Sequence, residues 1–88
     1  MIEVRLPSSL TALFPGLPRR LERPETPTVA ELIDGLDADW PGLRDRLCEP
    51  GPSLRRYINV FVNGQPATLT DTLHGGAVVH ILPAVAGG

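Results

Sequence analysis

The sequence predicts an α+β fold in which one main helix packs against a sheet of four to five strands. Three observations carry this prediction. Residues 1–6 alternate between apolar and polar side chains, as do residues 57–62, and residues 78–82 form a short apolar run; these patterns are typical of strands. Between them, residues 29–36 repeat apolar side chains at helical spacing. One helix against one sheet implies a single hydrophobic core.

The first third of the chain holds one clear strand and two weaker elements. Residues 1–6 form a half-buried strand, which Pro7 ends because proline cannot donate to a sheet. Residues 8–14 can form a short helical turn, since Leu10, Leu13 and Phe14 share one face. A short second strand is predicted over residues 19–22. The strand face that we expect to be buried consists of Ile2, Val4 and Leu6.

The main helix begins with a recognisable cap. Thr28 and Glu31 have the spacing of a capping box, with Thr28 as the N-cap residue. The helix should end before Pro41, and residues 43–47 can add a further helical turn ahead of a loop at residues 49–52. The apolar stripe that we expect to face the sheet consists of Val29, Leu32, Ile33 and Leu36.

The last third of the chain predicts three strands. Residues 57–62 form the strongest one, and Asn63-Gly64 is a hairpin-turn signal that returns the chain as a short edge strand over residues 65–68. After a turn at residues 74–76, residues 78–82 form the final strand, and Pro83 ends regular pairing.

Composition limits the function. The 88 residues suffice for one domain, which we place at residues 1–83 with a flexible tail at 84–88. No apolar run reaches the length of a membrane span and no signal peptide is evident, so we expect a cytoplasmic protein without a membrane partner. A net charge of −2 argues against nucleic acid. No acid/base or nucleophile pair is apparent, so no catalytic residue is assigned and no enzyme activity is expected.

The tail is the most informative segment. Gly87 and Gly88 follow Pro83-Ala84-Val85-Ala86 and end in a carboxylate. Glycine has no Cβ, so a Gly-Gly tail can enter a channel too narrow for other residues. A carboxylate needs activation before it accepts a nucleophile, and the chain has no phosphate-binding loop to supply it. The tail therefore has the features of a substrate for another enzyme.

The order of elements resembles the ubiquitin-like sulfur carriers, which are β-grasp proteins with a mixed sheet. This family includes the molybdopterin synthase small subunit and the thiamine thiazole sulfur carrier. The resemblance covers essentially the whole chain, and it is most specific in Tyr57-Ile58-Asn59-Val60-Phe61-Val62-Asn63 and in the last eight residues, Ile81 to Gly88. Two loops, at Gly64-Gln65 and at His74 to Ala77, depart from the acidic sequences that relatives often carry there.

The resemblance implies a function for the tail. An E1-like enzyme would adenylate the Gly88 carboxylate with ATP, and a sulfur donor would convert it to a thiocarboxylate. An acceptor enzyme would then use the sulfur for cysteine, molybdopterin, thiazole or a secondary metabolite. The carrier itself would bind no cofactor. The residues that thread into the partner would be Val85, Ala86, Gly87 and Gly88. Two alternatives remain: a protein modifier conjugated through Gly88, and a β-grasp interaction module that is never activated.

Alternation along the strands also predicts a docking face. If Val60 and Ile81 face the helix, then Phe61, His80 and Leu82 lie on the opposite face, where exposed apolar side chains commonly mark an interaction surface. The remaining candidate, Cys48, is interpreted as a partly buried structural thiol because no neighbour in sequence would activate it. Two histidines and one distant cysteine are a poor ligand set, so no metal site is expected.

Overall fold

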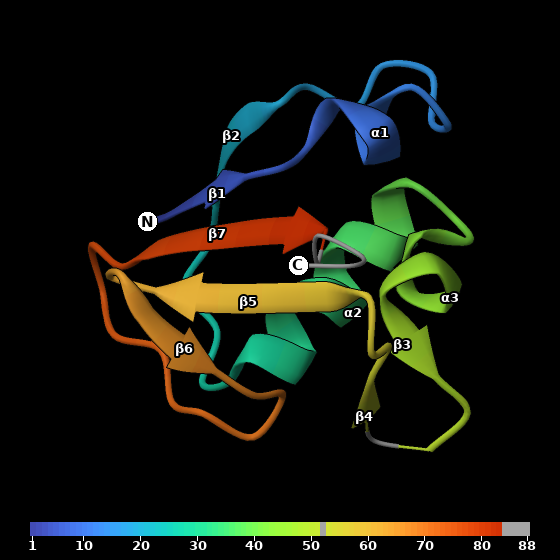
Figure 1. The fold of residues 1–88 in the computed structure, drawn as a ribbon. Coiled ribbons are helices and arrows are strands. Elements are labelled where there is room, and N and C mark those ends of the chain that lie inside the picture. Colours follow the sequence, from blue (N-terminus) through green and yellow to red (C-terminus); the bar gives the residue numbers. More distant parts are fainter. Residues whose placement is uncertain (52, 84–88) are drawn as a thin grey trace.

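Five strands form one mixed sheet in the computed structural model, which describes residues 1–51 and 53–83 (Figure 1). The strand order is β2-β1-β7-β5-β6. At its centre β1 and β7 run parallel, and the three other pairs in this sheet are antiparallel. The bounds are Ile2–Arg5 for β1, Arg20–Arg23 for β2, Ile58–Val62 for β5, Gln65–Ala67 for β6 and Val78–Pro83 for β7.

The main helix, α2 (Val29–Asp39), covers one face of this sheet and lies behind β5 and β7 in Figure 1. The whole predicted stripe is buried, each member being at most 1% exposed: Val29, Leu32, Ile33 and Leu36. At about 1.5–3 kcal/mol for each fully buried side chain, this stripe contributes on the order of 6–12 kcal/mol to folding, before allowance for a compact unfolded state. The helix is therefore the main packing partner of the sheet.

The hairpin signal is confirmed, and so is the Thr28 half of the capping box; among the described residues, no hydrogen bond joins the Glu31 side chain to the Thr28 backbone N–H. Asn63 and Gly64 both have positive φ, 50° and 83°, which matches the backbone twist of a two-residue turn between β5 and β6. The Thr28 hydroxyl oxygen accepts a hydrogen bond from the Glu31 backbone N–H at 3.3 Å, and it caps the first turn of α2. The short helix α1 (Ser8–Thr11) lies within the turn predicted over residues 8–14.

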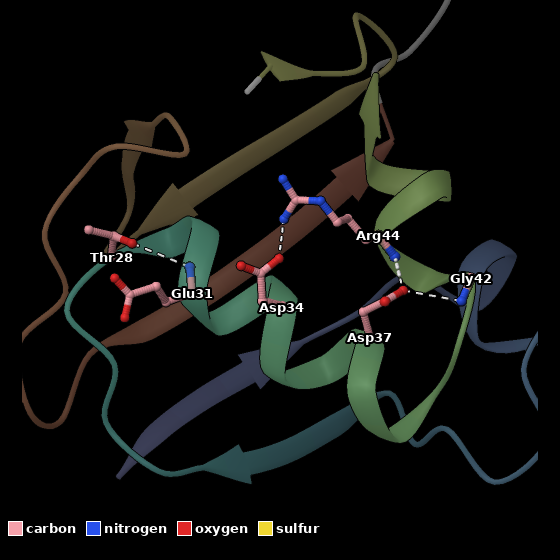
Figure 2. A network of polar contacts seen from close by, with 6 residues as sticks. All are labelled: Thr28, Glu31, Asp34, Asp37, Gly42 and Arg44. Carbon is pink, nitrogen blue, oxygen red and sulfur yellow. Dashed lines mark hydrogen bonds and ion pairs between the residues drawn. The ribbon is translucent and has the colours of Figure 1, made fainter. Parts of the chain in front are cut away.

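A polar network joins α2 to the next helix, α3 (Leu43–Leu47), as Figure 2 shows. Gly42 occupies the N-cap of α3 with φ 99°, a conformation that favours glycine, and it has no side chain to act as a cap. Asp37 of α2 supplies the missing acceptor: its Oδ1 accepts from the backbone N–H groups of Gly42 at 3.1 Å and Arg44 at 2.9 Å. Arg44 also forms an ion pair with Asp34. These contacts fix the angle between the two helices.

The prediction of a loop over residues 49–52 is partly wrong. Cys48–Glu49 forms a strand, β3, that pairs antiparallel with β4, Ser53–Leu54, in a separate two-stranded sheet. Gly51, with φ 96°, permits the tight reversal, and the Arg55 backbone N–H donates to the Leu47 carbonyl at 2.8 Å. Two-residue strands are too short to produce alternation that a sequence can reveal.

The ends of the five strands in the main sheet differ from the prediction by at most one residue. Pro83 is the last residue of β7, in register with Ile58, rather than the residue beyond the strand. Strand β2 lies one residue further along the chain than predicted. The tail predicted at residues 84–88 lies outside the described residues, so the proposed boundary after residue 83 stays a prediction.

Candidate functional site

The sheet face opposite α2, called the open face below, carries the three side chains that alternation places there. Phe61 and His80 stand opposite each other in the β5–β7 register, and Leu82 lies two residues further along β7. All three are half-buried. Their chain neighbours Val60 and Ile81 are buried beneath α2, at 2% and 0% exposure. The orientation of both strands therefore agrees with the sequence pattern, while the docking role stays a prediction.

These side chains surround a shallow hollow of about 470 Å³ on the open face. Its rim is held in place by Asn63, whose Oδ1 accepts a hydrogen bond from the Val78 backbone N–H at 2.9 Å. The hollow is lined by Arg5, Phe61, Asn63, Gly64, Val78, His80 and Leu82. An apolar floor with a few polar groups at its edge suits a partner's side chain better than a small metabolite, because the hollow is open to solvent.

An ion cluster borders this hollow on β1 and β2. The Glu3 carboxylate pairs with the Nε of Arg5 at 2.5 Å and with the Nε of Arg20 at 3.3 Å. The pKa of Glu3 is lowered, chiefly because Arg5 donates a hydrogen bond to the carboxylate, and the charges of Arg5 and Arg20 act in the same direction. Sequence reasoning did not identify this cluster. Alternation along β1 places Glu3 and Arg5 outside, but only the β1–β2 register brings Arg20 to them.

Cys48 lies in the core at 3% exposure, directly after α3 and opposite Leu54 of β4. Burial raises the pKa of its thiol, and the positive charge of Arg44 only partly opposes that shift. Desolvation is the largest cause of this rise in the Cys48 pKa, ahead of every neighbouring charge. Among residues 1–51 and 53–83, no group of three or more His, Cys, Asp and Glu side chains is placed to share a metal ion.

The tail residues that were predicted to enter a partner, Val85, Ala86, Gly87 and Gly88, lie outside the described part of the chain. The structure does place the point from which they continue. Strand β7 lies between β1 and β5 in the middle of the sheet, and it ends at Pro83, directly after Leu82 of the open face. Within residues 1–51 and 53–83, no helix has the length and apolar character needed to cross a bilayer.

A sheet with parallel central strands and one helix packed across it is the β-grasp fold of ubiquitin-like proteins, which confirms the predicted fold class. Residues 6–88 match the model of the ThiS family, so the chain belongs to this family. The predicted resemblance to ubiquitin-like sulfur carriers is thereby confirmed.

Three comparisons extend this result. The chain is 36% identical over 67 residues to the sulfur carrier protein CysO of Mycobacterium tuberculosis, covering 69% of this chain and 72% of that protein. It superimposes on a chain from the crystal structure of the Amycolatopsis orientalis BexX/CysO complex with a TM-score of 0.87 and 33% identity, covering 100% of both chains. It is also 35% identical over 65 residues to small archaeal modifier protein 3 of Haloferax volcanii, covering 69% of this chain and 70% of that protein.

Proposed function

We propose that this protein is a sulfur carrier that holds sulfur as a thiocarboxylate on Gly88, and that it is not itself an enzyme. The observation that carries the proposal is the ThiS family match, which extends through Gly87 and Gly88. The relative from M. tuberculosis, named a sulfur carrier protein, supports it further. The pathway that receives the sulfur can be cysteine, molybdopterin, thiazole or secondary-metabolite synthesis.

The proposed chemistry has two steps, both performed by other proteins. A carboxylate oxygen of Gly88 attacks the α-phosphate of ATP and pyrophosphate leaves, which gives an acyl adenylate. The terminal sulfur of a persulfide then displaces AMP and forms a C–S bond, which gives an acyl disulfide. A thiol attacks the donor's sulfur and cleaves the S–S bond, so the donor leaves as a disulfide and Gly88 keeps the thiocarboxylate. The carrier contributes a tail without Cβ atoms at its last two positions, which can lie close to the partner's reacting groups. ATP is bound by the partner, and the carrier holds no cofactor.

The proposed partners are an E1-like adenylating enzyme and an acceptor biosynthetic enzyme, both cytoplasmic. A CysO relative has been crystallised with BexX, which supports the view that carriers of this fold form complexes with another protein. Five residues follow Pro83, and an extended segment of that length spans at most about 18 Å. A partner that activates Gly88 is therefore close enough to contact Phe61, His80 and Leu82.

The test is a loading assay with the purified E1-like enzyme, ATP and a persulfide donor, followed by intact-protein mass spectrometry. We expect the mass change of one oxygen-to-sulfur exchange, dependent on ATP. Deleting Gly88, or adding a residue after it, should abolish the change, whereas Cys48→Ser should load like the wild type. Loading that survives deletion of Gly88 would exclude the proposed site.

A second candidate function is supported by the Haloferax relative, which is named a modifier protein. The same activated carboxylate could acylate lysines on target proteins. All 8 of this chain's Lys and Arg residues are arginine, so its own side chains offer no amine for chain extension. Covalent adducts on cellular proteins that depend on Gly88 would support this function. Their absence, with efficient sulfur transfer to an acceptor enzyme, would favour the carrier.

A further inference from the structure

One row of side chains crosses the whole open face. The strand registers align Arg20 of β2 with Arg5 of β1, Arg5 with His80 of β7, His80 with Phe61 of β5, and Phe61 with Pro66 of β6. The row is cationic on β2 and β1 and apolar on β5 and β6. Because adjacent strands lie about 4.8 Å apart, Arg5 and Phe61 are separated by roughly 10 Å.

A second hollow, of about 280 Å³, lies at the cationic end of this row. Its lining consists of Arg5, Leu6, Arg19, Arg20 and His80. It shares Arg5 and His80 with the apolar hollow, so the two form one continuous surface with a basic part and an apolar part.

The basic part keeps donors available for another molecule. Glu3 pairs with the Nε atoms of Arg5 and Arg20, and within the described ranges no hydrogen bond engages their terminal Nη groups. The Arg20 side chain is 67% exposed and that of Arg5 is 40% exposed. Glu22, opposite Glu3 in the register, is the second carboxylate of this region. The region therefore holds three arginines and two carboxylates, in a chain whose net charge is −2. The arginines are Arg5, Arg19 and Arg20, and the carboxylates are Glu3 and Glu22.

We propose that the open face binds a segment of the activating enzyme that presents a carboxylate to Arg5 and Arg20 and an apolar side chain to the hollow beside Phe61. This inference rests on the proposed function, since use of Gly88 requires an enzyme beside the end of β7. The planar guanidinium group of arginine can donate two parallel N–H hydrogen bonds to the two oxygens of a carboxylate, and its charge is opposite. An extended segment rises about 3.3 Å per residue and alternates its side chains, so an acidic and an apolar residue that both face the sheet lie two or four positions apart, about 7 or 13 Å.

The test measures the affinity of the purified E1-like adenylating enzyme from the same organism for the full chain, without ATP, by titration calorimetry at low and high salt. The double substitution Arg5→Gln/Arg20→Gln should weaken binding at least about tenfold at low salt. It should also reduce the salt dependence of the affinity, because salt screens the attraction between the arginines and a carboxylate of the partner. Arg46→Gln removes the same kind of charge from an exposed position on α3 and should bind within about twofold of the wild type.

Glu3→Gln gives the sharpest contrast, because it removes the carboxylate that competes with the partner. We expect binding to tighten by about threefold, an effect that a purely structural role of Glu3 does not produce. Circular dichroism should show all variants folded. Wild-type affinity and salt dependence in the double arginine variant, or no binding by the wild type, would overturn the proposed docking. Binding as predicted without any thiocarboxylate in the loading assay would support the docking and refute the proposed function.

Discussion

Two neighbouring residues of β5 allow a direct test of the sheet's orientation. Val60 is 2% exposed and packs in the core beneath α2. Val60→Arg would bury a charge without a partner, at a cost of about 3–5 kcal/mol or more. A domain of 88 residues has a free energy of unfolding of about 5–10 kcal/mol. We therefore expect this variant to lose most or all of its stability.

Phe61→Arg places the same side chain one residue away, on the open face, where water can solvate the guanidinium. The loss of half-buried aromatic surface should cost only about 1–2 kcal/mol. Thermal unfolding followed by circular dichroism measures both variants. We expect a cooperative transition for Phe61→Arg and none, or a far lower midpoint, for Val60→Arg. A folded Val60→Arg together with an unfolded Phe61→Arg would show that the strand is reversed and that the proposed docking face is the core.

Three further predictions concern stability. Ile33→Ala removes a side chain of 0% exposure and should lower the free energy of unfolding by about 2–5 kcal/mol in urea titrations; a change within error would contradict the position of α2. Asp37→Ala uncaps α3 at Gly42 and Arg44 and should cost about 0.5–2 kcal/mol, whereas Asp37→Asn, which keeps the acceptor oxygen, should cost less. The raised pKa of Cys48 stabilises the fold fully below the thiol's unfolded value of about 8.5, and this contribution is lost as pH rises through the folded value. Urea midpoints from neutral to alkaline pH should therefore fall less steeply for Cys48→Ser, and parallel curves would show that the thiol does not titrate with unfolding.

The main elements follow from local patterns. The stripe of α2 repeats at helical spacing, and alternation fixes which side of β5 and β7 is buried, so the core and the open face can both be predicted. Asn63-Gly64 determines its own turn because both residues tolerate positive φ. The small β3–β4 sheet could not be predicted, because strands of two residues contain no alternation. Its position follows from tertiary packing of Leu47 and Cys48.

The site could be predicted only in part. Phe61, His80 and Leu82 lie on strands whose pattern is clear, so their common face follows from the sequence. The cationic part depends on two pairings between distant segments: Arg5 with Arg20, and Arg5 with His80. Local patterns in a single sequence do not show which distant strands become neighbours in the sheet. The cap that Asp37 provides for α3 is missed for the same reason, since it joins two helices.

The most direct measurement is the position of sulfur in the loaded protein. Trypsin cleaves after arginine, so digestion separates residues 47–55, which contain Cys48, from residues 57–88, which contain Gly88 and no cysteine. Tandem mass spectrometry of the two fragments then locates the modification. We expect an oxygen-to-sulfur exchange on Gly88 and an unmodified Cys48. An added sulfur atom on Cys48, with an unchanged carboxylate on Gly88, would contradict the proposal that this protein carries sulfur on its tail.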